Sequence, residues 1–323
     1  MTGSHPRMPG RATGAVAGAC GGPGTAEREA SAVVHPVVVG VDGSDPGWRA
    51  ADWAADEAAR HGLPLRVVHA SWWERYDTFI PSTSVDRAEA RIAAADLVAA
   101  AEQRLTLRQP GLTVSGAVLA MDPVKALVEE GRSAHAVVVG SRGLGTLAEM
   151  LLGSVGLGLA GQATCPVLVV RGREENETGR FRRVVLGVSR GNVDSHATAF
   201  AFQEAAARDA ELVAVHAWRR SEERSGAGGT GESGAETLLD SALHRAAPAQ
   251  EQVPVVRESV EGSPRHVLLK AAESADLLVV GARRRRGLFG LELGLVNHAV
   301  LHHATCPVAL VPRNDEPHDR PTE

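Results

Sequence analysis

Short apolar runs alternate with longer amphipathic stretches through most of this sequence. In the first half the apolar runs are Pro36–Val41, Leu65–Ala70, Thr113–Leu119, Ala136–Gly140 and Val167–Val170. Most of these runs are rich in Val and apolar without interruption, which is typical of strands buried on both faces of a parallel sheet. The runs therefore predict five parallel strands.

The stretches between the apolar runs predict helices at about Pro46–His61, Asp86–Gln109, Asp122–Glu130 and Thr146–Gln162. Pro46 and Pro123 stand where the first turn of a helix tolerates proline, and Asp122 is a suitable N-cap. Strands that alternate with helices of this length indicate an α/β fold with a doubly wound sheet.

The whole pattern occurs twice. Val37–Val41 recurs at Val184–Val188, a shift of 147 positions from 37 to 184. Thr164–Val167 recurs at Thr305–Val308, a shift of 141 positions from 164 to 305. Such self-similarity indicates two copies of one structural unit. We therefore expect two tandem doubly wound domains, each with a five-stranded parallel sheet, in a Rossmann-like architecture.

Polar and low-complexity segments bound the two copies. Residues 1–33 are rich in Gly and Ala, lack the apolar stretch of a signal peptide and predict a disordered tail. The expected order after the tail is domain 1 at 34–171, a linker at 172–180, domain 2 at 181–313 and a second tail at 314–323. Ser221–Glu236 is rich in Gly and Ser and predicts a flexible insertion in the second copy.

Composition and charge exclude several classes of function. Aromatic residues make up 3% of the 323 residues and the net charge is −5, which argues against a nucleic-acid partner. The three cysteines form no CxxC motif, and so sparse a count fits a reducing cytoplasm. Met150–Val170 carries no charge and is long enough to span a bilayer, but its four glycines and Pro166 favour a helix followed by a short strand.

A glycine motif follows the fourth predicted strand. Its members, in order, are Gly140, Ser141, Arg142, Gly143 and, after nine intervening residues, Gly153 and Ser154. In a doubly wound sheet, ligands bind at the carboxyl ends of the strands, and glycines let backbone N–H groups approach an anion. Asp42 follows the first strand at the same edge, where a carboxylate can accept hydrogen bonds from ribose. The alternative is that these glycines form ordinary turns between strands and helices.

Three motifs in this order resemble the universal stress protein family. They are VGVDGS at Val39–Ser44, the string G-x2-G-x9-G-[S/T] from Gly140, and CPVLVV at Cys165–Val170. The resemblance covers about Val34–Arg171 and Phe181–Arg313 and is to the tandem type. Because family members with this pattern bind ATP, usually without rapid turnover, the resemblance implies ATP with Mg2+ as the ligand.

The resemblance also implies which residues of the first copy bind the nucleotide. Gly40, Val41 and Asp42 are expected at the adenine and the ribose. The residues expected at the ribose and the phosphates are Gly140, Ser141, Gly143, Gly153, Ser154 and Val155. The resemblance also places Arg142 close to the phosphates, although an exposed loop arginine is the favoured interpretation. Asp122 stands where the family usually has a glycine before its proline.

The second copy departs from the motif. The residues Ser189, Arg284 and Leu295 stand in place of Asp42, Gly143 and Ser154. Gly187 and Gly281 persist, and we keep them as candidate nucleotide contacts. Arg283–Arg286 either supply charge to an anion or form a solvated loop. We therefore expect the two copies to bind nucleotide unequally.

Three histidines form a second candidate site. His298 and His302, which lie next to His303, form an i, i+4 pair, and this spacing suits zinc. The sequence shows no third ligand that would complete a site with this pair. Packed or exposed helix histidines are therefore the favoured interpretation. We expect no protein-bound metal.

The function implied by the resemblance is that of a cytoplasmic, ATP-binding regulator or sensor in stress or dormancy adaptation. ATP would stabilise one arrangement that an unidentified protein partner recognises. The alternatives are a slow ATP hydrolase or phosphotransferase, and an interaction scaffold without a ligand. The sequence has no Walker lysine and no positioned base, so we expect no catalytic residues. A homo-oligomer is possible, and the resemblance suggests that Val167–Val170 pairs with Val308–Val311.

Overall fold

A computed structural model describes residues 34–70, 84–143, 152–189, 196–219, 232–244, 252–282, 285–287 and 290–313. Both predicted tails, Trp72-Trp73, Arg283-Arg284 and most of the Gly- and Ser-rich insertion lie outside these residues. The described residues of that insertion, from Glu232 on, belong to a helix and correct the expected flexible stretch at its end.

The first copy is the predicted parallel sheet with helices between its strands. Its elements are β1 Val37–Gly40, α1 Asp45–His61, β2 Leu65–Ala70, α2 Ser84–Arg108, β3 Val114–Leu119, α3 Pro123–Gly131, β4 Ala136–Gly140, α4 Ser154–Gln162 and β5 Val167–Val170. The strand order is β3-β2-β1-β4-β5. One expected boundary is wrong: Leu152 and Gly153 precede α4, because Gly153 is its extended N-cap.

The second copy repeats this order of elements. They are β6 Arg183–Gly187, α6 His196–Ala207, β7 Glu211–Trp218, α7 Glu232–His244, β8 Val255–Glu261, α8 Pro264–Ala272, β9 Leu277–Ala282, α9 Leu295–His303 and β12 Val308–Pro312. A hairpin of β10 Arg285–Gly287 and β11 Gly290–Glu292 is added between β9 and α9. The strand order is β12-β9-β6-β7-β8. The predicted α/β class with two tandem doubly wound domains is confirmed.

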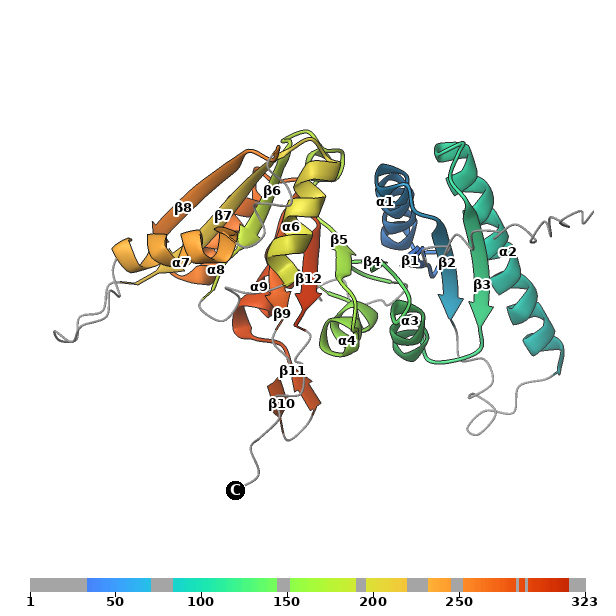
Figure 1. Cartoon of the computed structure of the whole chain (residues 1–323). Helices are drawn as coiled ribbons and strands as arrows, with labels where there is room; N and C mark the ends of the chain where they lie inside the picture. Colours follow the sequence, from blue (N-terminus) through green and yellow to red (C-terminus); the bar gives the residue numbers. More distant parts are fainter. Residues whose placement is uncertain are drawn as a thin grey trace, which may run out of the picture. The chain divides into compact units, whose positions relative to one another are not determined.

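The two sheets join along their last strands into one ten-stranded sheet. β5 and β12 pair antiparallel, with Leu168 opposite Ala309 and Val169 opposite Val308, and they lie side by side in the middle of the ribbon (Figure 1). The expected pairing across the copies is therefore confirmed. It removes two sheet edges that would otherwise expose unpaired backbone groups.

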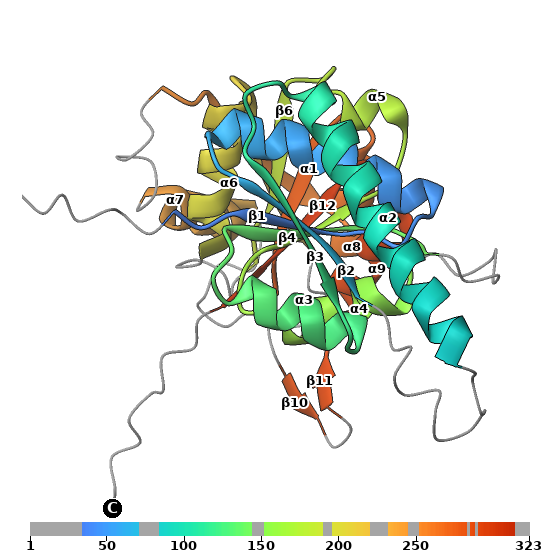
Figure 2. The ribbon, with the colours of Figure 1, turned by 90° about the vertical axis from the view of Figure 1, so that its right-hand side faces the viewer.

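Helices cover both faces of the joined sheet. One apolar core lies under α1, α2, α6 and α7, and a second lies under α3, α4, α8 and α9, and each contains residues of both copies. Figure 2 shows α1 above the strands and α3 and α4 below them. The inner strands are mostly buried on both faces, as their unbroken apolar runs predict, whereas the edge strands β3 and β8 are partly exposed.

The expected linker contains a short helix, α5 Glu174–Glu177, that packs against the second copy. Asn176 is buried, and its side-chain amide donates a 2.7 Å hydrogen bond to the Ala275 carbonyl oxygen. Arg171, which ends the first copy, donates to the carbonyl oxygens of Ala304 and His302 at the end of α9. The segment between the copies is therefore anchored along its length.

Among the described residues, no helix combines the length and the apolar character that crossing a membrane requires. The part of Met150–Val170 that the structure describes contains the nine-residue α4 and then strand β5, as predicted from its glycines and proline.

Candidate functional site

The candidate site lies where the strand order of the first copy reverses. β1 pairs with β2 on one side and with β4 on the other, so the loops after β1 and β4 leave the sheet next to each other. Open α/β sheets bind ligands at such switch points, outside the carboxyl ends of the strands. The sheet topology thus brings the two predicted motif segments to one place.

Asp42, just after β1, is fixed by the start of α1. Its Oδ1 accepts hydrogen bonds from the Ser44 backbone N–H (3.0 Å) and hydroxyl (2.6 Å). The Ser44 hydroxyl in turn accepts a hydrogen bond from the Gly47 N–H (3.1 Å) and caps α1. His69 at the end of β2 contacts the Val41 carbonyl oxygen through Nδ1 at 2.8 Å. The loop after β1 is therefore held from two sides.

Two glycines, one at the end of β4 and one just after it, leave room for neighbouring groups. A Cβ at Gly140 would lie 2.6 Å from the Pro46 carbonyl oxygen in the first turn of α1. A Cβ at Gly143 would collide with the Asp42 carboxylate. The glycine at position 143 therefore lets the Asp42 carboxylate stand at the end of β4.

The first turn of α4 closes the site. The Gly153 N–H donates a 2.8 Å hydrogen bond to the Ser141 carbonyl oxygen, which ties the start of the helix to the loop after β4. No side chain caps α4, so its first backbone N–H groups, from Ser154 on, have no partner within the helix. A helix N-terminus with such N–H groups favours an anion.

These segments enclose a cavity of about 600 Å³. Nine of the ten residues predicted for the first copy line it, namely Gly40, Val41, Asp42, Gly140, Arg142, Gly143, Gly153, Ser154 and Val155. Ser141 is not among the lining residues; it contributes the carbonyl that holds Gly153. The volume is within the range of about 300–1,000 Å³ that is usual for small-molecule sites.

The cavity has an apolar wall that the motif does not contain. This wall consists of Val68, Ala70, Pro123, Leu127, Val139 and Leu152. Gly47 and Gly156 also line the cavity. Gly158 packs against α3, since a Cβ there would lie 2.7 Å from Val124. Apart from Leu152, which precedes Gly153, the apolar wall comes from strands and from α3, so the glycine motif does not mark it.

Comparison with known proteins identifies the family. The sequence profile of the Universal stress protein family matches residues 34–171 and 180–312. The chain belongs to this family. Universal stress protein Rv2005c of Mycobacterium tuberculosis is 38% identical over 285 residues, which are 85% of this chain and 96% of that protein.

Two further proteins match this chain over most of their length. A universal stress protein of Mycolicibacterium smegmatis is 34% identical over 291 residues, covering 87% of this chain and 98% of that protein. The crystal structure of a universal stress protein from Archaeoglobus fulgidus superposes with a TM-score of 0.65 at 17% identity, covering 86% of this chain and 98% of that chain. The latter likeness supports the fold.

The second universal stress protein domain lacks several features of the first site. Asn297 occupies the position of Gly156, and its side-chain amide donates a 3.1 Å hydrogen bond to the Gly281 carbonyl oxygen. Leu295, in place of Ser154, is 90% exposed at the start of α9. Gly187 is buried, and a Cβ there would lie 3.1–3.2 Å from Val280 and Leu268. Unequal binding of nucleotide by the two copies remains a prediction. The structure adds that a side chain, that of Asn297, stands at the position of Gly156.

The histidines of α9 pack on one another. The rings of His298 and His302 stack with centroids 4.2 Å apart. Burial, then the charges of His298 and His303, lower the pKa of His302. Among the described residues, the group of ligand atoms close enough to share a metal ion does not include these histidines. The described cysteines, Cys165 and Cys306, are buried free thiols.

Proposed function

We propose that the first domain binds ATP with Mg2+ in the cavity between β1, β4 and α4, and that the protein acts as a nucleotide-dependent regulator of stress adaptation. The proposal is carried by one observation: a cavity of nucleotide size combines an apolar wall, a fixed carboxylate and a helix N-terminus at the switch point of the sheet.

Each part of the cavity suits one part of the ligand. The apolar wall with Val41, Val68 and Leu127 fits a planar base. Asp42 is placed to accept hydrogen bonds from ribose hydroxyls. The N–H groups at the start of α4 and the Arg142 guanidinium favour phosphate. Mg2+ would arrive with the nucleotide, bound chiefly by its phosphates.

The regulatory role follows from binding without fast chemistry. Backbone N–H groups stabilise a bound phosphate in the ground state and in the transition state about equally, which improves binding without accelerating transfer. We propose that ATP shifts the chain toward an arrangement that a cytoplasmic protein partner recognises.

The decisive experiment is calorimetric titration of the full chain with ATP and Mg2+, in parallel for a pair of glycine variants. Gly143→Ala places a Cβ against the Asp42 carboxylate and is expected to weaken ATP binding at least tenfold. Gly111→Ala is the matched control, since no atom lies within 4 Å of a Cβ there. The mass of any small molecule released when the purified protein is denatured identifies the resident ligand.

Absence of any nucleotide binding by the wild-type chain would contradict the proposal. It would favour the alternative function, an interaction scaffold that binds no ligand. Equal affinities of Gly143→Ala and the wild type for ATP would show that ATP binds outside this cavity.

A further inference from the structure

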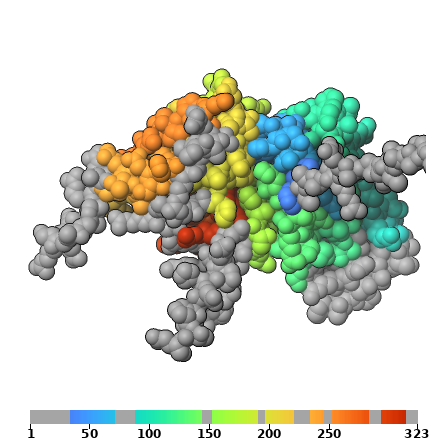
Figure 3. Space-filling model, in the orientation of Figure 1, coloured from blue at the N-terminus to red at the C-terminus, as the bar shows by residue number. Residues whose placement is uncertain are grey.

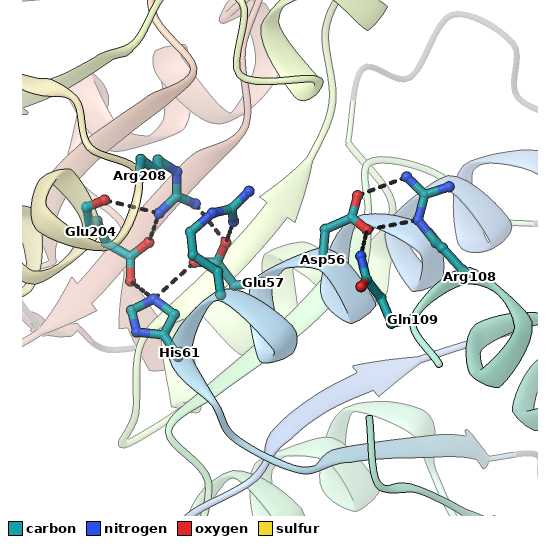
Figure 4. A network of polar contacts seen from close by, with 8 residues as sticks. Asp56, Glu57, His61, Arg108, Gln109, Glu204 and Arg208 are labelled. Carbon is teal, nitrogen blue, oxygen red and sulfur yellow. Dashed lines mark hydrogen bonds and ion pairs between the residues drawn. The ribbon is translucent and has the colours of Figure 1, made fainter. Parts of the chain in front are cut away.

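Four ligand-type side chains meet between the two domains, far from the nucleotide cavity. Glu57 and His61 stand one turn apart at the end of α1, and Glu204 lies in α6. His135 immediately precedes β4, at the end of the strand opposite the cavity. The surface view shows α1 and α6 side by side, and the close-up shows His61 directed toward Glu57 and Glu204 (Figures 3 and 4).

The polar atoms that face the centre of this cluster are buried and lack hydrogen-bond partners among the described residues. They are Glu57 Oε1, His61 Nε2, His135 Nε2 and Glu204 Oε1. The side chains of Glu57 and Glu204 are 1% and 0% exposed. A buried polar atom without a hydrogen bond costs about 1–3 kcal/mol. His61 Nε2 lies within ion-pair distance of Glu57 Oε1 and Glu204 Oε1, so either a proton on His61 or a bound cation offsets this cost.

The other carboxylate oxygens are already neutralised. Arg208, whose side chain is 7% exposed, contacts Glu57 Oε2 at 2.7 Å and also pairs with Glu204 Oε2. Arg60 pairs with Glu57 Oε2 as well. The arginines thereby orient both carboxylates, and each Oε1 is directed toward the histidines. Outer contacts of this kind are typical of metal sites, where they fix the orientation of the ligands.

The internal repeat explains the arrangement. The shift of 147 positions that relates β1 to β6 places Glu57 on Glu204 and His61 on Arg208. The two glutamates are thus equivalent residues of the two domains that meet where α1 and α6 touch. On one side of the two glutamates, the second domain supplies the guanidinium of Arg208. On the other side, the first domain supplies the imidazoles of His61 and His135.

Among the described residues, Glu204 has fewer arginine partners than Glu57. Glu204 Oε2 pairs with Arg208, whereas Glu57 Oε2 contacts both Arg208 and Arg60. The Glu204 Oε1 atom faces His61 instead.

We propose that Glu57, His61, His135 and Glu204 form a site for a divalent transition-metal ion of the zinc class, which links the two domains. Imidazole nitrogens with carboxylate oxygens suit zinc, whereas Ca2+ and Mg2+ prefer oxygen alone.

The distances around His61 are close to those of a tetrahedral site. Bonds of about 2.0–2.2 Å to Zn2+ put neighbouring ligand atoms about 3.3–3.6 Å apart. His61 Nε2 lies 3.1 Å from Glu204 Oε1 and 3.4 Å from Glu57 Oε1. The ligand atoms of His61, His135 and Glu204 all lie within 4.8 Å of one another, and Glu57, next to His61, is the fourth candidate ligand.

The test uses the full chain, stripped of metal with a chelator, desalted and titrated with ZnCl2. Bound zinc is measured by calorimetry and elemental analysis, and stability by thermal unfolding. We expect one Zn2+ per chain, with a rise in Tm because the ion binds the folded state. His61→Gln should abolish this binding, and His135→Gln should weaken it at least tenfold. His298→Gln is the matched control, since it alters the exposed histidine group of α9.

Each outcome either supports or overturns the proposed zinc site. Loss of zinc binding in the His61 and His135 variants, with His298→Gln unchanged, supports the site. If His61→Gln does not fold, His135→Gln, at a partly exposed position, gives the answer. Absence of zinc binding by the wild-type chain would overturn the proposal and leave a proton on His61 as the cation facing the glutamates. Loss of binding in His298→Gln alone would place the zinc on α9.

Discussion

At the residue scale, Asp42 connects the nucleotide cavity to the fold. One carboxylate oxygen holds Ser44, which caps α1, while the other stands against Gly143. A single side chain therefore links β1, the start of α1 and the end of β4. A substitution at Asp42 changes the shape of the cavity together with its charge, which is why Gly143 gives the sharper test of binding.

The two buried cysteines lead to a prediction about reactivity. Burial raises the pKa of Cys165 to about 11, and burial, followed by the charge of Asp276, raises that of Cys306 to about 12. Since the thiolate is the reactive form, both thiols should resist iodoacetamide at pH 8 in the folded chain. Peptide mass spectrometry should find both alkylated after unfolding in guanidinium, and native labelling should increase only as the pH rises toward these values. Rapid native alkylation, or a disulfide between the two, would contradict this prediction.

At the element scale, the two helix N-termini that follow the fourth strand of each domain differ. α4 begins with Ser154 and has a glycine in its first turn, whereas α9 begins with the exposed Leu295 and has Asn297 at the glycine position. The Asn297 side-chain amide donates a hydrogen bond to the Gly281 carbonyl oxygen, whereas the first domain has a glycine at this position. The second domain thus offers a phosphate no hydroxyl at the start of the helix and has a larger side chain in the first turn.

This difference predicts one tight ATP site per chain. Calorimetry should give a stoichiometry near one, with any second site at least tenfold weaker, and Asp42→Ala should remove the tight site. Two sites of equal affinity that both survive Asp42→Ala would show that the second domain binds nucleotide in another way.

The pairing of β5 with β12 predicts a large cost for a charge at their junction. Val169 is 0% exposed and faces Val308 in the register. Val169→Glu buries an unpaired carboxylate and should lower the free energy of unfolding by more than about 3 kcal/mol. Ser115→Glu, at an exposed position of the edge strand β3, is the control and should change it by less than about 0.5 kcal/mol. Urea denaturation measures both, and equal stabilities would mean that the junction is dispensable.

Many of the strands and helix ends can be predicted from the sequence, because the signals for them lie in short segments of the chain. Continuous apolar runs identify the strands, and Asp122 caps α3 through a 2.8 Å hydrogen bond to the Lys125 N–H, as expected. The apolar wall of the cavity could not be predicted, because Val68 and Leu127 become neighbours only when the sheet forms. The Glu57 and Glu204 pair had a signal, a glutamate at equivalent positions of two alanine-rich helices, but its meaning depends on how the domains pack.

At the scale of the whole molecule, the cavity is equipped for holding a nucleotide rather than for cleaving it. Among the described residues that line it, Asp42 is the carboxylate, and its Oδ1 is engaged by Ser44. Rapid phosphoryl transfer requires charge neutralisation at the γ-phosphate and an oriented nucleophile. Groups that mainly bind the nucleotide, without orienting a nucleophile, do not meet these requirements.

We therefore predict turnover well below about 1 s⁻¹, the lower bound of typical enzymes. The measurement is phosphate release by the full chain with Mg2+ and excess ATP. Gly143→Ala serves as the control for contaminating ATPases, because it should lose binding without affecting a contaminant. A rate above that bound that disappears in Gly143→Ala would place the protein among the ATP hydrolases.

Joining both domains in one polypeptide permits an asymmetry that a homodimer does not have. Two identical subunits related by a twofold axis must carry the same residue at equivalent positions, so His61 would face another His61, or Arg208 another Arg208. In the tandem chain these positions have diverged, and one pair of glutamates receives a guanidinium from one side and imidazoles from the other. The two halves are thereby complementary parts in a fixed one-to-one ratio, and exchanging either for a second copy of its neighbour would place the same residue type on both sides of the glutamate pair.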